Sequence, residues 1–166
     1  MNHLYFIRHG QSRGNAESFV ADASSHLTPL GVTQAEKSGQ ELKSLSIDLI
    51  VSSPMTRARQ TAETISEQIG LSKEKIVILE ELRERGLGGL ENKPKEKTSE
   101  WYFETAEGFG METLEELRRR MKIALEKVKV LATDFENVLL VGHSISGGVL
   151  ANVREMGNAE YLEIKL

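Results

Sequence analysis

The sequence contains no cysteine, and this absence excludes disulfide bonds and thiolate metal sites. No apolar run is long enough to cross a bilayer, and the N-terminus lacks the long apolar segment of a secretory signal. We therefore expect a cytoplasmic protein without a membrane partner. Acidic residues outnumber basic ones, and the formal net charge is −4. A nucleic-acid partner is not expected, since it would favour a basic face.

What is present is the composition of a soluble globular domain. The 166 residues are 39% hydrophobic and 28% charged, values that are unlike those of a disordered chain. The length fits a single domain, residues 1–166, with a substantial core. Neither an internal repeat nor a low-complexity tract is visible. The composition is compatible with a monomer or a homodimer.

Short apolar runs of strand length alternate along the chain with longer helical patterns. This alternation is typical of βα units, and it predicts an α/β three-layer sandwich with helices on both faces of a mostly parallel sheet. The predicted strands are residues 4–7, 47–52, 75–79, 137–141 and 161–165. The predicted helices are residues 31–44, 55–69, 112–133 and a helix that begins near residue 145.

Residues 86–110 interrupt this alternation. The segment contains several glycines, Pro94 and the aromatic residues 101–103 (Trp101, Tyr102 and Phe103). We interpret it as a loop or short helical excursion over a functional site, because long connections are usually functional. The aromatic residues would either face a substrate as a lid or anchor the excursion to the core.

Two histidines each follow an apolar run. His9 lies in FIRHGQS and His143 lies in LLVGHSISGG. The carboxyl ends of parallel strands meet on one rim of a sheet, where ligands bind, so both histidines can share one pocket. Arg8 precedes the first histidine, and Arg57 lies in the first turn of the helix predicted after another strand, in VSSPMTRARQ. Arginines beside a histidine indicate phosphate chemistry carried by that histidine.

These strings and the glutamate-containing LRERGLGG stand in the order typical of the histidine phosphatase superfamily. The chain resembles these phosphoglycerate-mutase-like proteins over essentially its whole length, and LTPLGVTQA and GMETLEELRRR are lesser matches. The resemblance implies the phosphoglycerate-mutase-like fold with an antiparallel edge strand. It also implies a small phosphorylated substrate, and a reaction that uses neither a metal nor an organic cofactor.

The resemblance further implies a role for each site residue. His9 would be the nucleophile that forms a phosphohistidine, and the positive charges around it disfavour its protonated ring. Arg8, Arg57 and His143 would bind the phosphoryl oxygens, with His143 most useful when charged. Glu84 would protonate the leaving alcohol and later deprotonate water. The further residues expected to bind substrate are Ser12, Asn15 and Ser144.

Several other functions share some of these motifs. Residues 142–148 are similar to the nucleophile elbow of α/β-hydrolases with Ser144 as nucleophile, but no histidine follows His143 to act as its base. A cofactor-dependent phosphoglycerate mutase typically reads Glu-Arg-His-Tyr-Gly at the acid, where this chain reads Glu84-Arg85-Gly86-Leu87-Gly88. A phosphoprotein or phosphohistidine phosphatase is another alternative, but the short phosphohistidine phosphatases commonly lack this glutamate. A domain that only binds phosphorylated ligands usually lacks the nucleophile or the acid. We therefore predict a phosphomonoester hydrolase, whose substrate no motif specifies.

Overall fold

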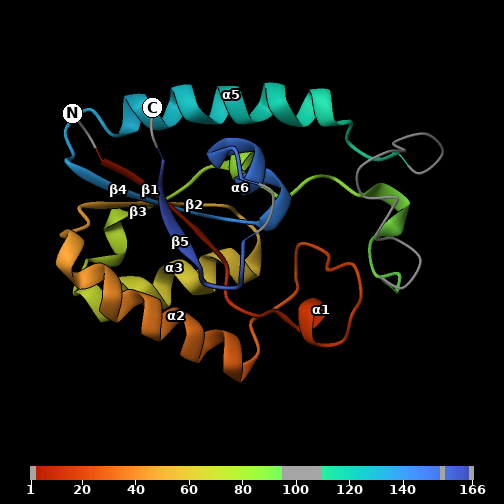
Figure 1. The fold of residues 1–166 in the computed structure, drawn as a ribbon, viewed down its shortest axis with the longest axis horizontal. Helices are drawn as coiled ribbons and strands as arrows, with labels where there is room; N and C mark the ends of the chain where they lie inside the picture. The colour runs from red at the N-terminus through yellow and green to blue at the C-terminus, as the bar shows by residue number, and fades with distance from the viewer. Residues whose placement is uncertain (1–2, 95–109, 154–155, 165–166) are drawn as a thin grey trace.

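The computed structural model describes residues 3–94, 110–153 and 156–164. One sheet has the strand order β3-β2-β4-β1-β5 (Figure 1). The strands are β1 (His3–Arg8), β2 (Leu49–Ser52), β3 (Ile76–Ile78), β4 (Asn137–Gly142) and β5 (Tyr161–Ile164). The first four pair in parallel, and β5 runs antiparallel to β1 at one edge. The predicted sheet, including its antiparallel edge strand, is confirmed.

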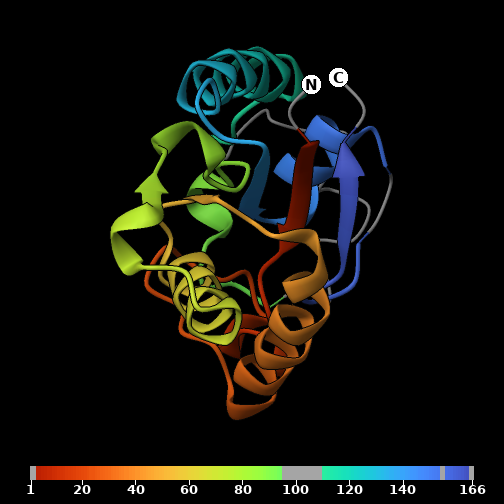
Figure 2. The same cartoon turned by 90° about the vertical axis from the view of Figure 1, so that its left-hand side faces the viewer.

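Helices cover both faces of this sheet, which confirms the predicted three-layer sandwich (Figure 1, Figure 2). On one face lie α2 (Pro29–Leu42) and α3 (Thr56–Ile69), and on the other lie α5 (Leu114–Leu131) and α6 (Ser144–Ala151). A single-turn helix, α1 (Arg13–Ala16), stands in the loop after β1, where the sequence predicted only loop. Short 3₁₀ helices span Lys43–Leu45, Lys73–Lys75, Glu80–Leu82 and Gly88–Leu90. None of the helices that the structure describes is both long and apolar enough to span a membrane.

The central strands are buried on both sides, so their side chains alternate between two apolar cores. From β1, Leu4 and Phe6 pack under α5 and α6, whereas Ile7 packs against α2 and α3. Leu139 and Leu140 of β4 divide between the cores in the same way. Burial on both faces explains why these strands read as nearly continuous apolar runs, the pattern expected in a parallel sheet.

The helix ends follow the signals in the sequence with small shifts. Thr28 caps α2 by accepting an N–H of the first turn, and Pro29 occupies the first helical position, so the helix begins two residues earlier than predicted. The end of α3 is set by Gly70, whose φ of 74° is readily adopted by glycine. A capping box of Thr113 and Glu116 starts α5.

Close packing explains the glycine in the middle of α6. A Cβ atom added at Gly147 would lie 2.1 Å from Cζ of Phe6, and one at Gly142 would lie 2.9 Å from Cε2 of the same ring. Side chains at these positions would push α6 away from β1. The two glycines therefore hold the first turn of α6 against the end of the sheet.

The interrupting segment is described at its two ends, residues 86–94 and residue 110. Leu87 and Leu90 form a small apolar cluster with Val20 and Met111. The first part of the segment therefore packs onto the loop that follows β1. Trp101, Tyr102 and Phe103 lie outside the described residues, and their role as lid or anchor stays a prediction.

Candidate active site

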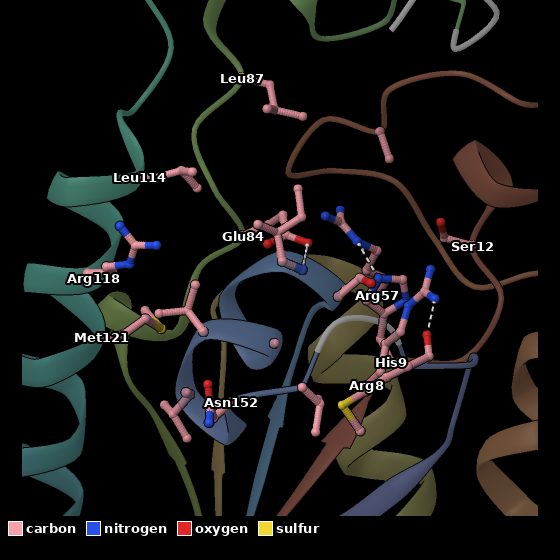
Figure 3. A pocket seen from close by; sticks show the side chains of 18 of the residues that line it. Arg8, His9, Ser12, Arg57, Glu84, Leu87, Leu114, Arg118, Met121 and Asn152 are labelled. Carbon is pink, nitrogen blue, oxygen red and sulfur yellow. Dashed lines mark hydrogen bonds between the residues drawn. The ribbon is translucent and has the colours of Figure 1, made fainter. Parts of the chain in front are cut away.

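A cavity of about 990 Å³ lies at the carboxyl ends of β1 and β4 (Figure 3). Arg8 and His9 line it from the end of β1, and Arg57 lines it from the first turn of α3. Glu84 enters from the segment after β3, and α5 and α6 supply much of the apolar lining. The lining also includes Ser12, Asn15 and Ser144, so every residue predicted for the site except His143 borders the cavity. His143 lies just beneath it, fully buried, with its ring centroid 5.1 Å from that of His9.

The hydrogen bonds of His9 define its protonation state. Its Nδ1 lies 2.7 Å from the carbonyl oxygen of Gly10, and its Nε2 lies 3.1 Å from Nε of Arg57. An arginine nitrogen can only donate, so Nε2 carries the lone pair and Nδ1 carries the proton that it donates to Gly10. The ring is therefore held as the neutral tautomer, with the nitrogen capable of nucleophilic attack turned toward Arg57.

The backbone around His9 is fixed by residues that the sequence did not indicate. The amide of Asn158 donates to the carbonyl of His9 at 3.2 Å, and the Gly10 N–H donates to the hydroxyl of Thr61 at 3.1 Å. Thr61 stands one turn after Arg57 on α3, so one helix supports both the arginine and the nucleophile. No pattern marks Asn158, which lies in the loop before β5.

Arg57 is buried, with 3% of its surface exposed, and each of its nitrogens has a partner. Besides the bond to His9, one terminal nitrogen donates to the carbonyl of Asp22 at 2.7 Å and the other to Sδ of Met55 at 3.2 Å. Burial lowers the pKa of Arg57, but an arginine remains charged in proteins. The guanidinium therefore ties the loop after β1 to the nucleophile and brings a positive charge against it.

Two buried donors beside His9 have no acceptor among the described residues. One is Nε of Arg8, whose Nη1 donates to the carbonyl of Met156. The other is Nδ1 of His143. Buried polar groups are normally hydrogen-bonded, so two neighbouring orphan donors indicate the place of an anion.

Ser53 determines which nitrogen of His143 carries the proton. The Ser53 hydroxyl lies 2.8 Å from Nε2 of His143, and it already accepts the N–H of Met55 at 3.3 Å. Ser53 is buried, and of the two partners of its hydroxyl only Nε2 of His143 can accept the hydroxyl proton. Ser53 therefore donates to Nε2, and the ring proton lies on Nδ1, the nitrogen without a partner among the described residues.

The charge predicted for His143 is wrong. Burial lowers the pKa of His143 well below its ordinary value, and the nearby positive charges of Arg57 and Arg8 lower it further. The ring is therefore neutral near pH 7. It can still contribute to anion binding, because the neutral ring donates one hydrogen bond through Nδ1.

Asn15 is oriented by its neighbours in the loop after β1. Its Oδ1 accepts both the N–H and the hydroxyl of Ser12, each at 3.0 Å, and the Nδ2 of Asn158 at 3.3 Å. Because a backbone N–H can only donate, the atom held here is the oxygen. The amide nitrogen of Asn15 is left for the cavity. Ser144, the first residue of α6, also lines the cavity.

The carboxylate of Glu84 is held at the N-terminus of α6. Its oxygens accept the N–H groups of Arg85 at 2.9 Å, Ile145 at 3.1 Å and Ser146 at 2.8 Å. The first N–H groups of a helix lack partners within the helix, and the carboxyl oxygens of Glu84 supply acceptors for two of them. Figure 3 shows Glu84 between the side of the cavity that carries His9 and the side that carries Arg118. These bonds join the segment that carries Glu84 to α6, the helix that follows His143.

An ion pair between Arg120 of α5 and Glu112, which lies just before that helix, holds the backbone that carries Glu84. Arg120 forms a bidentate pair with Glu112 at 2.6 and 2.7 Å, and Glu112 also accepts the N–H of Gly86 at 3.1 Å. Burial alone would raise the pKa of Glu112, but the hydrogen bonds from Arg120 and Gly86 keep it below its ordinary value. Arg120 donates in addition to three carbonyls of the segment, at Glu81, Arg83 and Glu84.

The sequence contained a signal for this pair, since both residues lie in GMETLEELRRR, but no role followed from the string alone. Within the described ranges, no group of three or more His, Asp or Glu side chains could hold a metal ion.

Comparisons with known proteins show the family to which the chain belongs. The family described as "Histidine phosphatase superfamily (branch 1)" matches residues 4–164. A protein of Hydrogenobacter thermophilus, provisionally named phosphoserine phosphatase 2, is 35% identical over 161 residues, 90% of this chain and 75% of that protein. One of Klebsiella pneumoniae, named probable phosphoglycerate mutase, is 33% identical over 177 residues, 100% of this chain and 80% of that protein.

A solved structure extends the likeness to the fold. The phosphoglycerate mutase of Bacillus anthracis superimposes with a TM-score of 0.83, covering 98% of this chain and 86% of its own. Its sequence identity is 23%, so this match concerns the fold alone.

Proposed function

We propose that this chain, which belongs to branch 1 of the histidine phosphatase superfamily, hydrolyses phosphomonoesters of a small metabolite through a phosphohistidine on His9. The observation that carries the proposal is the tautomer of His9, because the bonds to Gly10 and Arg57 leave the lone pair on Nε2. A nucleophile of this kind needs no further deprotonation before it attacks.

In the first step, Nε2 of His9 attacks the phosphorus atom and the bond to the ester oxygen breaks. The leaving oxygen takes a proton from Glu84, since an alkoxide is a poor leaving group. Arg57 moves its Nε–H from the histidine to a phosphoryl oxygen, and the orphan donors of Arg8 and His143 bind the same oxygens. Hydrogen bonds of this kind stabilise the charge of the transition state.

In the second step, water attacks the phosphohistidine. Glu84, now a carboxylate, takes the proton of the water as the oxygen bonds to phosphorus. The bond between phosphorus and Nε2 breaks, inorganic phosphate leaves, and His9 regains its lone pair. Ser12, Asn15 and Ser144 line the cavity in which both steps take place.

The residues after Glu84 favour hydrolysis over a mutase reaction. A mutase must exclude water and return the phosphoryl group to a second hydroxyl, which demands polar groups that hold the substrate in both orientations. Gly86 and Leu87 stand where the family's mutases typically have histidine and tyrosine. Leu87 packs into the apolar cluster with Val20 and offers no hydrogen bond to a substrate.

The direct test is to trap the intermediate. Enzyme mixed with a ³²P-labelled phosphomonoester and quenched in base should carry phosphate on His9 that is stable to base and labile to acid. The variant His9→Ala should carry none and should lose turnover. Label of the same stability in His9→Ala would refute the assignment, and conversion of 3-phosphoglycerate to its 2-isomer without release of phosphate would favour the mutase.

The proposal includes three properties that rest on the sequence. The reaction is expected to need no metal, so full activity should survive a chelator. A cytoplasmic location and a monomeric or homodimeric state belong to the same proposal, and sedimentation of the purified protein measures the second.

A further inference from the structure

The cavity is much larger than a phosphate group. Its volume of about 990 Å³ lies at the upper end of the range for pockets that bind drug-sized ligands. The phosphate end accounts for the part around His9, Arg8 and Arg57. The remainder, between α5 and α6, is therefore available to the organic part of a substrate.

The wall of this remainder is apolar. Met121 and Leu125 of α5 and Ile145 and Val149 of α6 line it. All four also pack on the core beneath the two helices, so their positions are fixed by the fold. An aliphatic or aromatic segment of a substrate would lose water against this surface, which favours its binding.

Two cations stand at the far side of the apolar wall. Arg118 and Lys122 line the cavity and are four residues apart on α5, so they share one face of the helix. Neither has an ion pair with a described residue, whereas the next residue, Arg119, pairs with Glu115 at 3.7 Å. Figure 3 shows Arg118 on the opposite side of Glu84 from His9.

No described acid opposes these cations within the cavity. Glu84 is the one acidic residue among the described lining residues, and its carboxylate is occupied by the N–H groups at the start of α6. The cavity therefore has positive charge at both ends and an apolar surface between them.

We propose that the preferred substrates are phosphomonoesters whose alcohol carries a second anionic group beyond an apolar segment, bound by Arg118 and Lys122. The inference rests on the proposed function and adds the substrate class of the same site. The phosphate would sit against His9, the apolar segment would lie along α5 and α6, and the second anion would pair with the two cations.

The expected effects are modest, because both cations are exposed. Each added methylene group should raise kcat/KM by up to about fourfold until the apolar wall is covered. An ion pair at an exposed site is worth up to about fivefold, so the two cations together should favour a terminal carboxylate by about tenfold at the best length.

The test compares two series of substrates on the same enzymes. The first series consists of neutral n-alkyl phosphates, and the second of ω-carboxyalkyl phosphates of matched chain length. The ratio of kcat/KM between the two series is measured at each length for the wild type, Arg118→Met and Lys122→Met. Each variant should reduce the preference for the carboxylate by about threefold while changing turnover of the neutral ester less than twofold.

Arg119→Met is the matched control. It removes the same charge from the same helix but from a position that does not line the cavity, so the preference for the carboxylate should survive. If Arg119→Met lost the preference for the carboxylate to the same extent, the preference would result from the overall charge of the helix and not from binding in the cavity. A ratio near one at every length, or a ratio that Arg118→Met and Lys122→Met leave unchanged, overturns the proposed substrate class.

The ratio also separates this inference from the proposed function. If His9→Ala loses all turnover and the wild type shows a ratio near one, the proposed phosphohistidine mechanism stands and only the second anion site is refuted. Turnover retained in His9→Ala refutes the proposed mechanism and with it the assignment of the phosphate end.

Discussion

The two ends of the cavity are built in different ways. At the phosphate end, His9, Arg57 and His143 are buried, and backbone carbonyls or buried hydroxyls hold them in place. At the α5 end, Arg118 and Lys122 are exposed and lack an ion pair with any described residue. The difference separates two tasks, since fixed donors suit charge stabilisation and exposed cations suit the choice of substrate. Changes at the first end should abolish the chemistry, whereas changes at the second should alter preference.

The substitution Arg57→Lys, at the phosphate end, should have the largest effect and is the strongest test of the difference between the two ends of the cavity. Lysine keeps the charge but cannot bond His9 and the Asp22 carbonyl from one planar group. We expect kcat/KM to fall by about a hundredfold to a thousandfold for every phosphomonoester. Arg59→Lys, an exposed position on the same helix, serves as the control and should retain activity. A loss of less than tenfold in Arg57→Lys would show that Arg57, like the cations at the α5 end, is not essential for the chemistry.

Arg120→Met tests the segment that lies between the two ends. Loss of the bonds to the carbonyls of Glu81, Arg83 and Glu84 should displace the acid, with a loss of about thirtyfold on alkyl esters. Aryl esters with good leaving groups need little protonation and should lose less than fivefold. The kinetic signature is a steeper dependence of kcat/KM on the pKa of the leaving alcohol.

Two variants calibrate that result. Glu84→Gln should show the same steep dependence, and Arg119→Met should keep the dependence of the wild type. A uniform loss over all esters in Arg120→Met would show that the arginine supports the fold without positioning the acid.

The burial of His143 at the phosphate end should appear as a pH dependence of stability. Its pKa in the folded protein is below the ordinary value of 6.5, so below about pH 6.5 the unfolded chain takes up a proton that the folded protein refuses. The free energy of unfolding should therefore decrease as the pH is lowered below about 6.5, by up to about 1.4 kcal/mol per pH unit. Urea titrations at pH 7.5 and 5.5 should show this extra loss in the wild type relative to His143→Asn. Equal losses would contradict the lowered pKa.

The smallest effect is expected for Ser144→Ala. The hydroxyl lines the cavity, and a single hydrogen bond to substrate is worth no more than about tenfold. The phosphohistidine should still form in this variant. Complete loss of activity would instead revive a serine nucleophile, as in the α/β-hydrolase alternative.

The features that could be predicted from the sequence are those with local signals. His9 follows an apolar strand directly, and Arg57 stands just after a strand in the first turn of the next helix. Thr28 and Gly70 mark helix ends through their own side chains or backbone angles. In each case, the residue and its signal lie within a few positions of each other.

The features that escaped prediction depend on contacts between distant parts of the chain. Asn158 bonds the carbonyl of His9 across 149 positions, and Arg120 reaches the Glu84 carbonyl across 36. The neutral state of His143 results from burial by the assembled fold, which its neighbours in sequence do not reveal. The helix α1 is a single turn in a polar loop, too short for any periodic pattern.

The bond between Arg57 and His9 also determines what the resting site ignores. In the structure, the lone pair of the nucleophile already accepts an N–H, so it is shielded from passing electrophiles. An anionic phosphoryl oxygen offers the guanidinium a stronger acceptor and releases the lone pair at the moment it arrives. A neutral alkylating reagent offers no such exchange. The substrate's own charge thus unmasks the histidine that will attack it.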